Sequence, residues 1–321
     1  MFCIVLKFVL CLYRENILTM TTIIKTNDLT FHFHGKQNAV NELNLSVPEG
    51  SIYGFLGPNG AGKSTTIRML AGLLRPASGS IEMFDKSFKK AKSAILRRSA
   101  YMIEEPTLYK HLTGRQNIEL ICKSGGYDAK RIDEVLDWVH LSDDKNRKAG
   151  NYSMGMKQRL GIAGALLPDP DLFVLDEPTN GLDPQGMYEI RELIVDLNKK
   201  YGKTIFISSH LLGEIEKMCT HVGIIHHGKG IFEGSIQELA DVNKSVKLFR
   251  IETLQMEKAN EVLSAFENLK KVDENTLEVQ PKDKEQQYQI IASLVNAGVE
   301  FTQAYEVKNS LEELFIQVTE N

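Results

Sequence analysis

Cysteine is scarce in this chain and shows no functional spacing. The four cysteines among 321 residues are Cys3, Cys11, Cys122 and Cys219. They lack the short paired spacings of a zinc site and the even framework of a small secreted domain. We therefore expect incidental or structural cysteines in a protein of a reducing compartment, and a disulfide scaffold is excluded.

The sequence also lacks a hydrophobic run long enough to cross a membrane. Residues 1–13 are apolar apart from Lys7, but a spanning helix needs roughly 20 residues, and no small-residue cleavage site follows. We expect residues 1–21 to be an N-terminal extension, most of which is not translated because the true start is Met20. The alternative is that these residues form an N-terminal strand or a segment that touches the membrane. Mass spectrometry of the native N-terminus would decide. The chain itself is not expected to form a pore.

Nor does the chain show a basic stripe or an aromatic platform of the kind that binds nucleic acid. Its formal net charge is −4, and the lysines and arginines gathered in residues 86–98 are interpreted as a solvated surface. With 42% apolar and 25% charged residues, the composition is that of an ordinary globular protein, and 321 residues suit two domains. No nucleic-acid partner is expected.

A glycine-rich segment follows the apolar run Ile52–Leu56. It fits the pattern G-x-x-x-x-G-K-[ST], in which backbone N–H groups and the positive end of the following helix surround phosphate oxygens. Lys63 would reach the β and γ phosphates, and the Ser64 hydroxyl would bind Mg²⁺. The segment predicts a nucleoside triphosphate site, with a chance glycine-rich turn as the alternative. Its residues are Gly57, Pro58, Asn59, Gly60, Ala61, Gly62, Lys63, Ser64 and Thr65.

A second apolar run, Leu172–Leu175, ends in two carboxylates, Asp176 and Glu177. Ligands of parallel sheets bind at the carboxyl ends of the strands, where such a pair would lie. Asp176 is expected to hold Mg²⁺ and Glu177 to orient the attacking water, since phosphoryl transfer depends on positioned charge. A strand that merely ends at a polar loop is the alternative.

Further motifs follow in a fixed order. Tyr152–Arg159 reads Y-S-M-G-M-K-Q-R, Asn180–Pro184 reads N-G-L-D-P, and the strand Thr204–Ile207 leads through two serines to His210. With the two segments above, residues 22–235 resemble the nucleotide-binding domains of the ATP-binding cassette (ABC) family. The resemblance implies an α/β P-loop NTPase fold with an antiparallel β subdomain and a helical subdomain, ATP and Mg²⁺ as cofactors, and ATP hydrolysis.

The resemblance also implies roles for single residues. His210 resembles the family's switch histidine, a γ-phosphate contact, and Asp183 would belong to the ATP site. Ser153 and Gly155, at the start of an expected helix to Leu167, would bind the outer phosphate of a second subunit in a head-to-tail dimer. Because the chain has one set of motifs, a homodimer or a heterodimer with a second cassette is expected.

In this family an aromatic side chain stacks on adenine. Phe33 lies at about that position; Phe31 or His34 could serve instead, and an ordinary core phenylalanine is the remaining alternative. The surrounding residues Leu29–Val47 are expected to form short antiparallel strands.

The helical subdomain is expected within residues Gly114–His140. An apolar stripe at helical spacing falls on a helix that starts near Asp128, and we expect its residues to be core rather than partner contacts. The stripe consists of Ile132, Val135, Leu136 and Val139.

Two departures from the common family pattern indicate a particular branch. Glu104 stands where the family usually has a glutamine that binds Mg²⁺ and faces the membrane partner, and Met154 and Met156 vary the signature. A carboxylate is still a hard oxygen ligand, but it cannot donate an N–H. The combination resembles bacitracin-type and lantibiotic-immunity exporters of Gram-positive bacteria. An exposed loop acid of no consequence is the alternative for Glu104.

The resemblance implies the ATP-hydrolysing subunit of an ABC exporter for peptide antibiotics, conferring resistance or immunity. It would lie at the cytoplasmic face of a bacterial membrane with a separate permease subunit. A motor for another cargo, such as drugs or lipids, is the main alternative. A third alternative is a soluble ABC ATPase of translation or DNA repair. Two fused cassettes, zinc-binding cysteines or a long coiled coil would favour it, and none of these is visible in the sequence.

Residues 236–321 are expected to form a separate small α+β domain with no catalytic constellation. The stretch Asn309–Phe315 resembles a tail found on exporter cassettes, and dimer contact or regulation is the expected role, which deletion after Ser235 would test. Strand patterns cover Val246–Ile251, Leu277–Gln280 and Val299–Val307, and helical stripes cover Ala259–Phe266, Tyr288–Val295 and Leu311–Val318.

Overall fold

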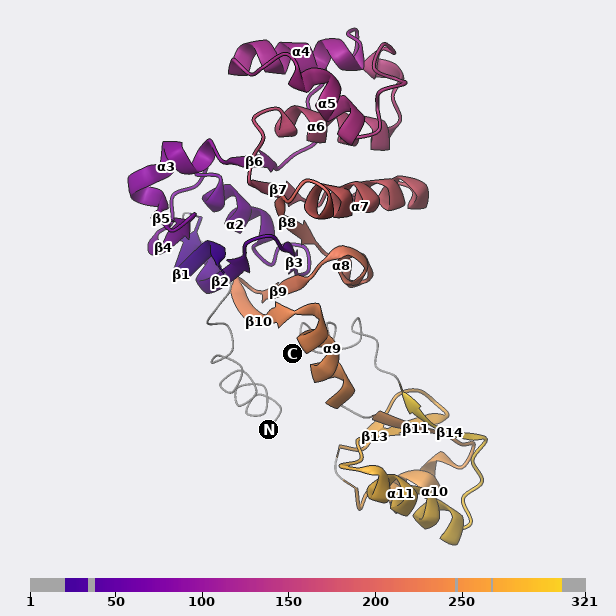
Figure 1. Ribbon diagram of the computed structural model, residues 1–321. Helices are drawn as coiled ribbons and strands as arrows, with labels where there is room; N and C mark the ends of the chain where they lie inside the picture. Colours follow the sequence, from indigo (N-terminus) through magenta and orange to yellow (C-terminus); the bar gives the residue numbers. More distant parts are fainter. Residues whose placement is uncertain (1–20, 34–37, 246–247, 267, 308–321) are drawn as a thin grey trace. The chain divides into compact units, whose positions relative to one another are not determined.

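The computed structural model describes residues 21–33, 38–245, 248–266 and 268–307. The chain divides into two compact units, Met1–Ile236 and Gln237–Asn321 (Figure 1). The predicted boundary lies after residue 235. The predicted extension, apart from residue 21, and the predicted helical stripe and tail at 309–318 lie outside the described residues.

A six-stranded sheet forms the centre of the larger unit. Its strands, in spatial order, are β10 (Lys229–Ser235), β9 (His221–His226), β3 (Ile52–Leu56), β8 (Thr204–Ser209), β7 (Leu172–Asp176) and β6 (Ser99–Met102). All neighbours are parallel except β9 and β10. β3 and β8 are buried along their whole length, which explains their continuous apolar runs. The carboxyl ends of β3, β6, β7 and β8 therefore meet at one edge, where ligands bind in such sheets.

Helices cover both faces of this sheet. α2 (Lys63–Leu70) packs against β7 on one face, while α7 (Pro184–Lys199) and α8 (Leu212–Met218) pack against β8 on the other (Figure 1). Asp183 is the N-cap of α7, because its Oδ1 accepts a hydrogen bond from Gly186 N at 3.0 Å. In the described part of the chain, no helix combines the length and the hydrophobicity needed to span a bilayer.

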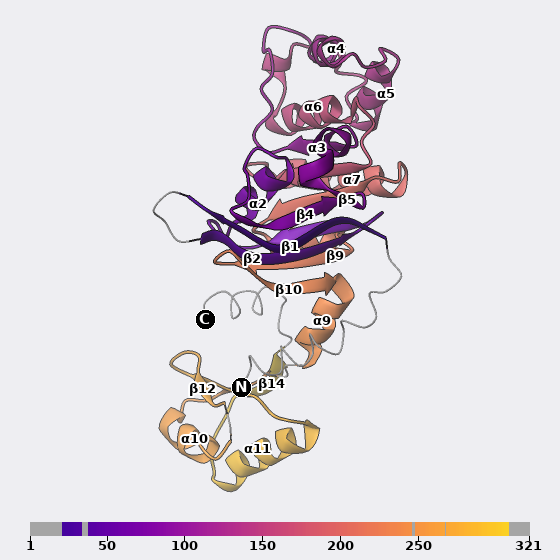
Figure 2. The same cartoon turned by 90° about the vertical axis from the view of Figure 1, so that its left-hand side faces the viewer.

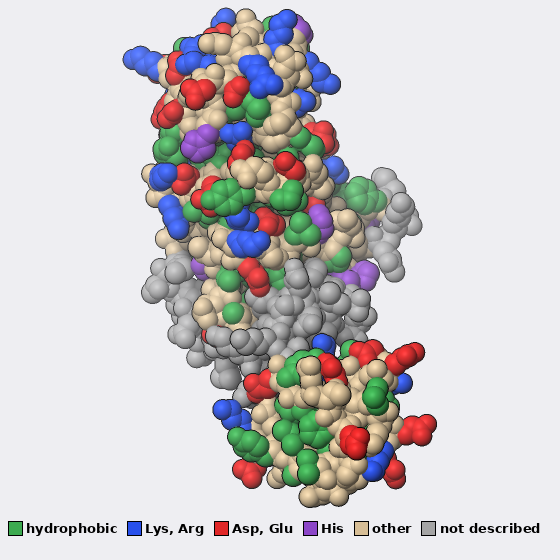
Figure 3. Space-filling view, turned by 90° about the vertical axis from the view of Figure 1, so that its right-hand side faces the viewer, with side chains coloured by type: hydrophobic (Ala, Val, Ile, Leu, Met, Phe, Trp, Pro, Cys, Tyr) green, Lys and Arg blue, Asp and Glu red, His purple; other side chains and the backbone are tan. Residues whose placement is uncertain are grey.

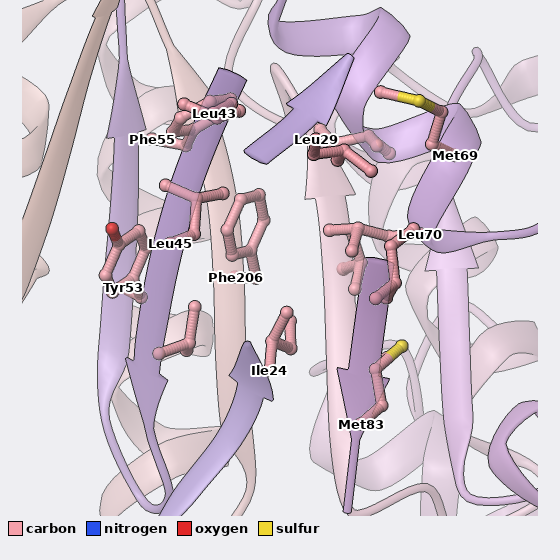
Figure 4. Close-up of a cluster of buried hydrophobic side chains, with 14 of the residues drawn as sticks. Ile24, Leu29, Leu43, Leu45, Tyr53, Phe55, Met69, Leu70, Met83 and Phe206 are labelled. Carbon is pink, nitrogen blue, oxygen red and sulfur yellow. The ribbon is translucent and has the colours of Figure 1, made fainter. Parts of the chain in front are cut away.

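An antiparallel sheet lies over the α2 side and encloses the main core. Its order is β2 (Asn38–Pro48), β1 (Thr22–His32), β4 (Ser78–Met83) and β5 (Lys86–Ser87), after which α3 (Phe88–Leu96) follows. Tyr53 and Phe206 stack with ring centroids 5.4 Å apart in this core. Each large side chain fully buried here stabilises the fold by roughly 1.5–3 kcal/mol. Figure 4 also shows Ile24, Leu29, Leu43, Leu45, Phe55, Met69, Leu70 and Met83 in this cluster.

Three helices form the helical subdomain: α4 (Gly114–Gly125), α5 (Arg131–Trp138) and α6 (Met154–Leu166), with the short 3-10 helix η1 (Ala149–Asn151) before α6. Thr113 and Gln116 form a capping box at the start of α4. α5 begins at Arg131 rather than near Asp128, because Asp128 Oδ1 accepts from Lys130 N at 2.9 Å and holds a turn there. The prediction of a core stripe is confirmed, since Ile132, Val135, Leu136 and Val139 are all buried.

The smaller unit begins within α9 (Ile236–Ser245), and after this helix its described residues form one antiparallel sheet and two further helices. The sheet order is β12 (Lys270–Lys271), β13 (Thr276–Val279), β11 (Leu248–Glu252) and β14 (Gln303–Val307), and the helices are α10 (Met256–Leu263) and α11 (Lys284–Asn296). The chain order β-α-β-β-α-β makes this a split β-α-β arrangement. The core includes Phe249, Ile251, Leu277, Ile290 and Leu294. An α+β unit was expected here, and the described elements overlap the predicted ones with shifted ends.

Candidate functional site

The glycine-rich segment connects β3 to α2 at the carboxyl edge of the central sheet. A Cβ on Gly57 would lie 2.4 Å from Ile225 O, and one on Gly62 would lie 2.5 Å from Ala39 O. Gly62 also has a backbone φ of +113°, which residues with a side chain rarely adopt. Positions 57 and 62 therefore both require glycine. Gly62 is the N-cap of α2 and offers no side-chain cap, so the first N–H groups of the helix remain available to an anion.

Lys63 is buried within this loop. Its side chain is 4% exposed, and Nζ donates to Gly57 O at 2.7 Å and to Pro58 O at 3.2 Å. The same ammonium lies 3.2 Å from Glu177 Oε1. A buried cation needs such partners, because an unpaired one carries a large desolvation cost. The loop thereby holds one fixed positive charge beside its amide groups.

Glu177 lies at the centre of the site. Its Oε2 lies 2.8 Å from His210 Nδ1, while Oε1 faces Lys63. The backbone of Glu177 has φ +49°, an uncommon conformation for a residue with a side chain, and such strain concentrates at functional sites. The structure therefore brings together Lys63, Glu177 and His210, which come from three different segments of the sequence.

Ser208 links the ends of β7 and β8. Asp176 and Ser208 are register partners in these parallel strands. Ser208 Oγ donates to Asp176 Oδ1 in a short hydrogen bond, and it accepts from Glu177 N at 2.9 Å. One hydroxyl thus holds both acids in place.

Glu104 lies at the rim of the site, in the loop after β6. Its side chain is 80% exposed and pairs with Arg68 at 3.6 Å. Among the described residues, no hydrogen bond or ion pair joins Glu104 to Asp176 or Glu177. Ser64 and Thr65 lie half-buried in the first turn of α2. The oxygen atoms of Ser64, Asp176 and Glu104 are hard donors of the kind Mg²⁺ prefers.

The signature segment forms the amino end of α6. Ser153 is the N-cap, and its Oγ accepts from Met156 N at 3.2 Å, as the sequence predicted. A Cβ on Gly155 would meet nothing closer than Gly186 Cα at 3.7 Å, so the start of α6 lies beside the start of α7. In the part of the chain that the structure describes, no hydrogen bond or ion pair joins Ser153, Gly155 or Asp183 to residues 57–65.

The candidate adenine contact, Phe33, directly follows the end of β1 and is exposed. Phe33 is 44% exposed and meets Phe31 edge to face, with ring centroids 5.0 Å apart. Phe31 packs against the main core, so Phe33 is the more accessible ring of the two. His34 lies outside the described residues.

Sequence reasoning passed over two residues that support the site. Ser208 was considered only as part of the link to His210. Its position opposite Asp176 depends on the register of two parallel strands, for which the sequence offers no direct signal. Gln158 was quoted as a signature letter without a role, but its Nε2 donates to Pro178 O at 3.1 Å. This bond ties α6 to the loop that follows Glu177.

The two cysteines within the described residues, Cys122 and Cys219, are free and buried. Burial raises the pKa of the Cys219 thiol well above its ordinary value. A thiol with a raised pKa is a poor nucleophile, which agrees with an incidental or structural role.

A parallel sheet whose first strand feeds a glycine loop into a helix, with acids ending a neighbouring strand, defines a P-loop nucleotide-binding domain. The family model described as "ABC transporter" matches residues 40–180. The chain belongs to this family, as an ATP-binding subunit with ATPase activity. The predicted fold class and family are confirmed.

Known relatives lie in the predicted branch. The chain is 52% identical over 233 residues to the bacitracin transport ATP-binding protein BcrA of Bacillus licheniformis, covering 72% of this chain and 76% of that protein. It is 42% identical over 200 residues to the lantibiotic transport ATP-binding protein SrtF of Streptococcus pyogenes, covering 62% and 86%. The solved structure of cbiO1 from Clostridium perfringens, part of the ABC transporter complex cbiONQ, has a TM-score of 0.63 at 26% identity, covering 76% and 95%.

Proposed function

We propose that this chain is the ATP-hydrolysing subunit of an ABC exporter that removes peptide antibiotics of the bacitracin or lantibiotic type. The convergence of Lys63, Glu177 and His210 at the sheet edge carries the hydrolytic part of the proposal. The cargo is supported by the names of the relatives BcrA and SrtF. The Glu104, Met154 and Met156 combination, noted from the sequence, points to the same branch.

In this proposal the glycine loop binds the ATP phosphates. Backbone N–H groups at the start of α2 contact the phosphate oxygens, and Lys63 neutralises charge on the β and γ phosphates. Ser64 and Asp176 would hold Mg²⁺, and Glu104 would add an oxygen from the rim. When bound, Mg²⁺ neutralises the charge that develops on the phosphates.

Glu177 orients the water that attacks the γ phosphate. A carboxylate that faces both Lys63 and His210 is held in one orientation, so little free energy is needed to orient it when the reaction occurs. His210 contacts the γ phosphate from the neighbouring strand end. Ser208 fixes the backbone of Glu177 and one oxygen of Asp176.

The second half of each ATP site comes from another cassette. Ser153 and Gly155 present the amino end of α6 to the γ phosphate bound by a partner, and Asp183 lies at the adjacent amino end of α7. Phe33 stacks on adenine. The partner is a second copy or a related cassette, and both work beneath a membrane permease at the cytoplasmic face of the membrane.

The test is antibiotic susceptibility of a host that lacks this gene. The host is complemented with the wild type or with Glu177→Gln and exposed to bacitracin, several lantibiotics and unrelated drugs. Hypersensitivity to one peptide class that only the hydrolysing form rescues is the expected result. An unchanged panel would overturn the cargo and leave an ATP-driven motor for something else.

A further inference from the structure

The segment around α3 is rich in basic residues. Residues 82–98 contain six lysines and arginines and two acids, a net charge of +4, whereas the whole chain carries −4. Phe88, Ala91 and Ile95 face the core, so the lysines are confined to the outer side of the helix. Figure 2 turns this side of α3 toward the viewer.

Four of these cations lack a carboxylate partner among the described residues. They are Lys86, Lys89, Lys90 and Arg97, and all four are exposed. Lys92 and Arg98 are already engaged, with Gly72 O at 2.8 Å and Asp171 at 2.6 Å. Two acids of the segment, Glu82 and Asp85, lie on the neighbouring strand and turn. Figure 3 shows the side opposite to that in Figure 2, and on it basic and acidic side chains are interspersed.

An exposed apolar side chain accompanies these cations. Lys92 Nζ donates to the carbonyl of Gly72, so the turn after α2 packs against α3. The next residue in that turn, Leu73, is 67% exposed. Exposed lysines with an exposed leucine on the adjoining turn are typical of surfaces that rest on a bilayer, where cations meet headgroup phosphates and the apolar group enters the interface.

We propose that the α3 surface, formed by Lys86, Lys89, Lys90, Arg97 and Leu73, binds the anionic phospholipid headgroups of the membrane. Lipid is favoured over an acidic protein partner because three of the four unpartnered cations are lysines, which act as mobile point charges and do not form the bidentate fork of arginine. The choice of a membrane rests on the proposed function, which places the chain beneath a permease. Binding of this kind falls off within a Debye length and weakens with salt.

The test is sedimentation of the purified full chain with vesicles. One set contains phosphatidylcholine alone, and the other an equimolar mixture with phosphatidylglycerol. The wild type should bind only the anionic vesicles, and less at high salt. Lys86→Gln/Lys89→Gln/Lys90→Gln should weaken partitioning about 100-fold, from roughly fivefold per cation.

A matched control removes three exposed lysines from the smaller unit. Lys270→Gln/Lys271→Gln/Lys284→Gln should retain binding to the anionic vesicles, and both variants should keep the wild-type rate of ATP hydrolysis. No binding to anionic vesicles, or an equal loss in both variants, would overturn the proposal. Loss of permease co-purification in detergent without any vesicle binding would also overturn it and assign the surface to protein contact. Since vesicle binding needs neither ATP nor antibiotic, its failure would leave the susceptibility test unaffected.

Discussion

At the scale of single residues, Glu177 is the position on which the proposed chemistry depends most. Glu177→Gln keeps the size of the side chain but removes the negative charge that faces Lys63 and His210. We expect the rate of ATP hydrolysis to fall about 10²–10⁴-fold, the usual contribution of a positioned acid or base, while ATP binding persists. Single-turnover hydrolysis and equilibrium nucleotide binding would measure the two effects separately.

Lys63→Ala is the contrasting control for that variant, because it should weaken nucleotide binding itself. It removes the one fixed cation in the glycine loop. Hydrolysis at the parental rate by Glu177→Gln would remove Glu177 from its assigned role. If Glu177→Gln no longer bound ATP, Glu177 would instead have a role in binding ATP before the reaction.

Ser208 offers a second prediction at this scale. Ser208→Ala removes the hydroxyl that joins Asp176 to Glu177 N and leaves a part-buried N–H without its partner, a loss of about 1 kcal/mol. We expect turnover to fall about tenfold or more, with a higher Mg²⁺ requirement because Asp176 is no longer fixed. Rescue by Ser208→Thr, which retains the hydroxyl, separates this positioning role from a packing defect. An unchanged Mg²⁺ dependence would contradict it.

At the scale of elements, Glu233 on β10 joins three strands of the larger unit. It accepts from Ser46 N on β2 at 2.6 Å and from the Tyr53 hydroxyl on β3 at 2.7 Å. Withdrawal from water raises the pKa of Glu233 above its ordinary 4.5, although both hydrogen bonds oppose the shift. At a pH between 4.5 and this raised pKa, Glu233 therefore retains a proton in the folded protein that it has released in the unfolded chain.

This raised pKa predicts how stability changes with pH. The stabilising contribution of protonated Glu233 is fully present below about pH 4.5, and it is lost as the pH rises through the higher pKa that Glu233 has in the folded protein. Glu233→Gln cannot ionise, so its free energy of unfolding relative to wild type should improve between pH 5 and pH 8. Urea denaturation at both values would measure this. The exposed acid Glu82 serves as the control, and a difference that does not change with pH would contradict the assignment.

The elements that could be predicted from sequence are those with a dense local signal. β3 and β7 were located because buried parallel strands are continuous apolar runs, and the start of α6 because Ser153 is a good N-cap. The start of α5 was misplaced because the Asp128 turn competes with the helix. The hydrogen bonds of Ser208 to Asp176 and Glu177 could not be predicted, since they depend on the register between two strands about 30 residues apart in sequence. The catalytic roles themselves stay predictions.

At the scale of the whole molecule, the proposed site is divided between two surfaces. The glycine loop, Glu177 and His210 lie at the sheet edge, while Ser153 and Gly155 lie at the amino end of α6, without a bond to residues 57–65 within the described chain. If two copies exchange these surfaces head to tail, each ATP site takes its loop from one copy and its signature from the other. A single copy would then hold two half sites.

This division predicts that two inactive variants restore activity when mixed. Lys63→Ala disables the loop, and Gly155→Asp places a negative charge at the amino end of α6, where the structure has room for a side chain. Each homodimer of one variant has two defective sites. A mixed dimer has one site with both defects and one with neither, so hydrolysis should recover to roughly a quarter of wild type if copies exchange freely. Steady-state ATPase assays of each variant alone and of the equimolar mixture would measure this recovery.

Mixing Lys63→Ala with Glu177→Gln is the control, because both defects lie on the loop side and every site of every dimer retains one defect. Recovery in that control, or none in the test mixture despite exchange of labelled copies, would contradict a composite site built from two copies of this chain.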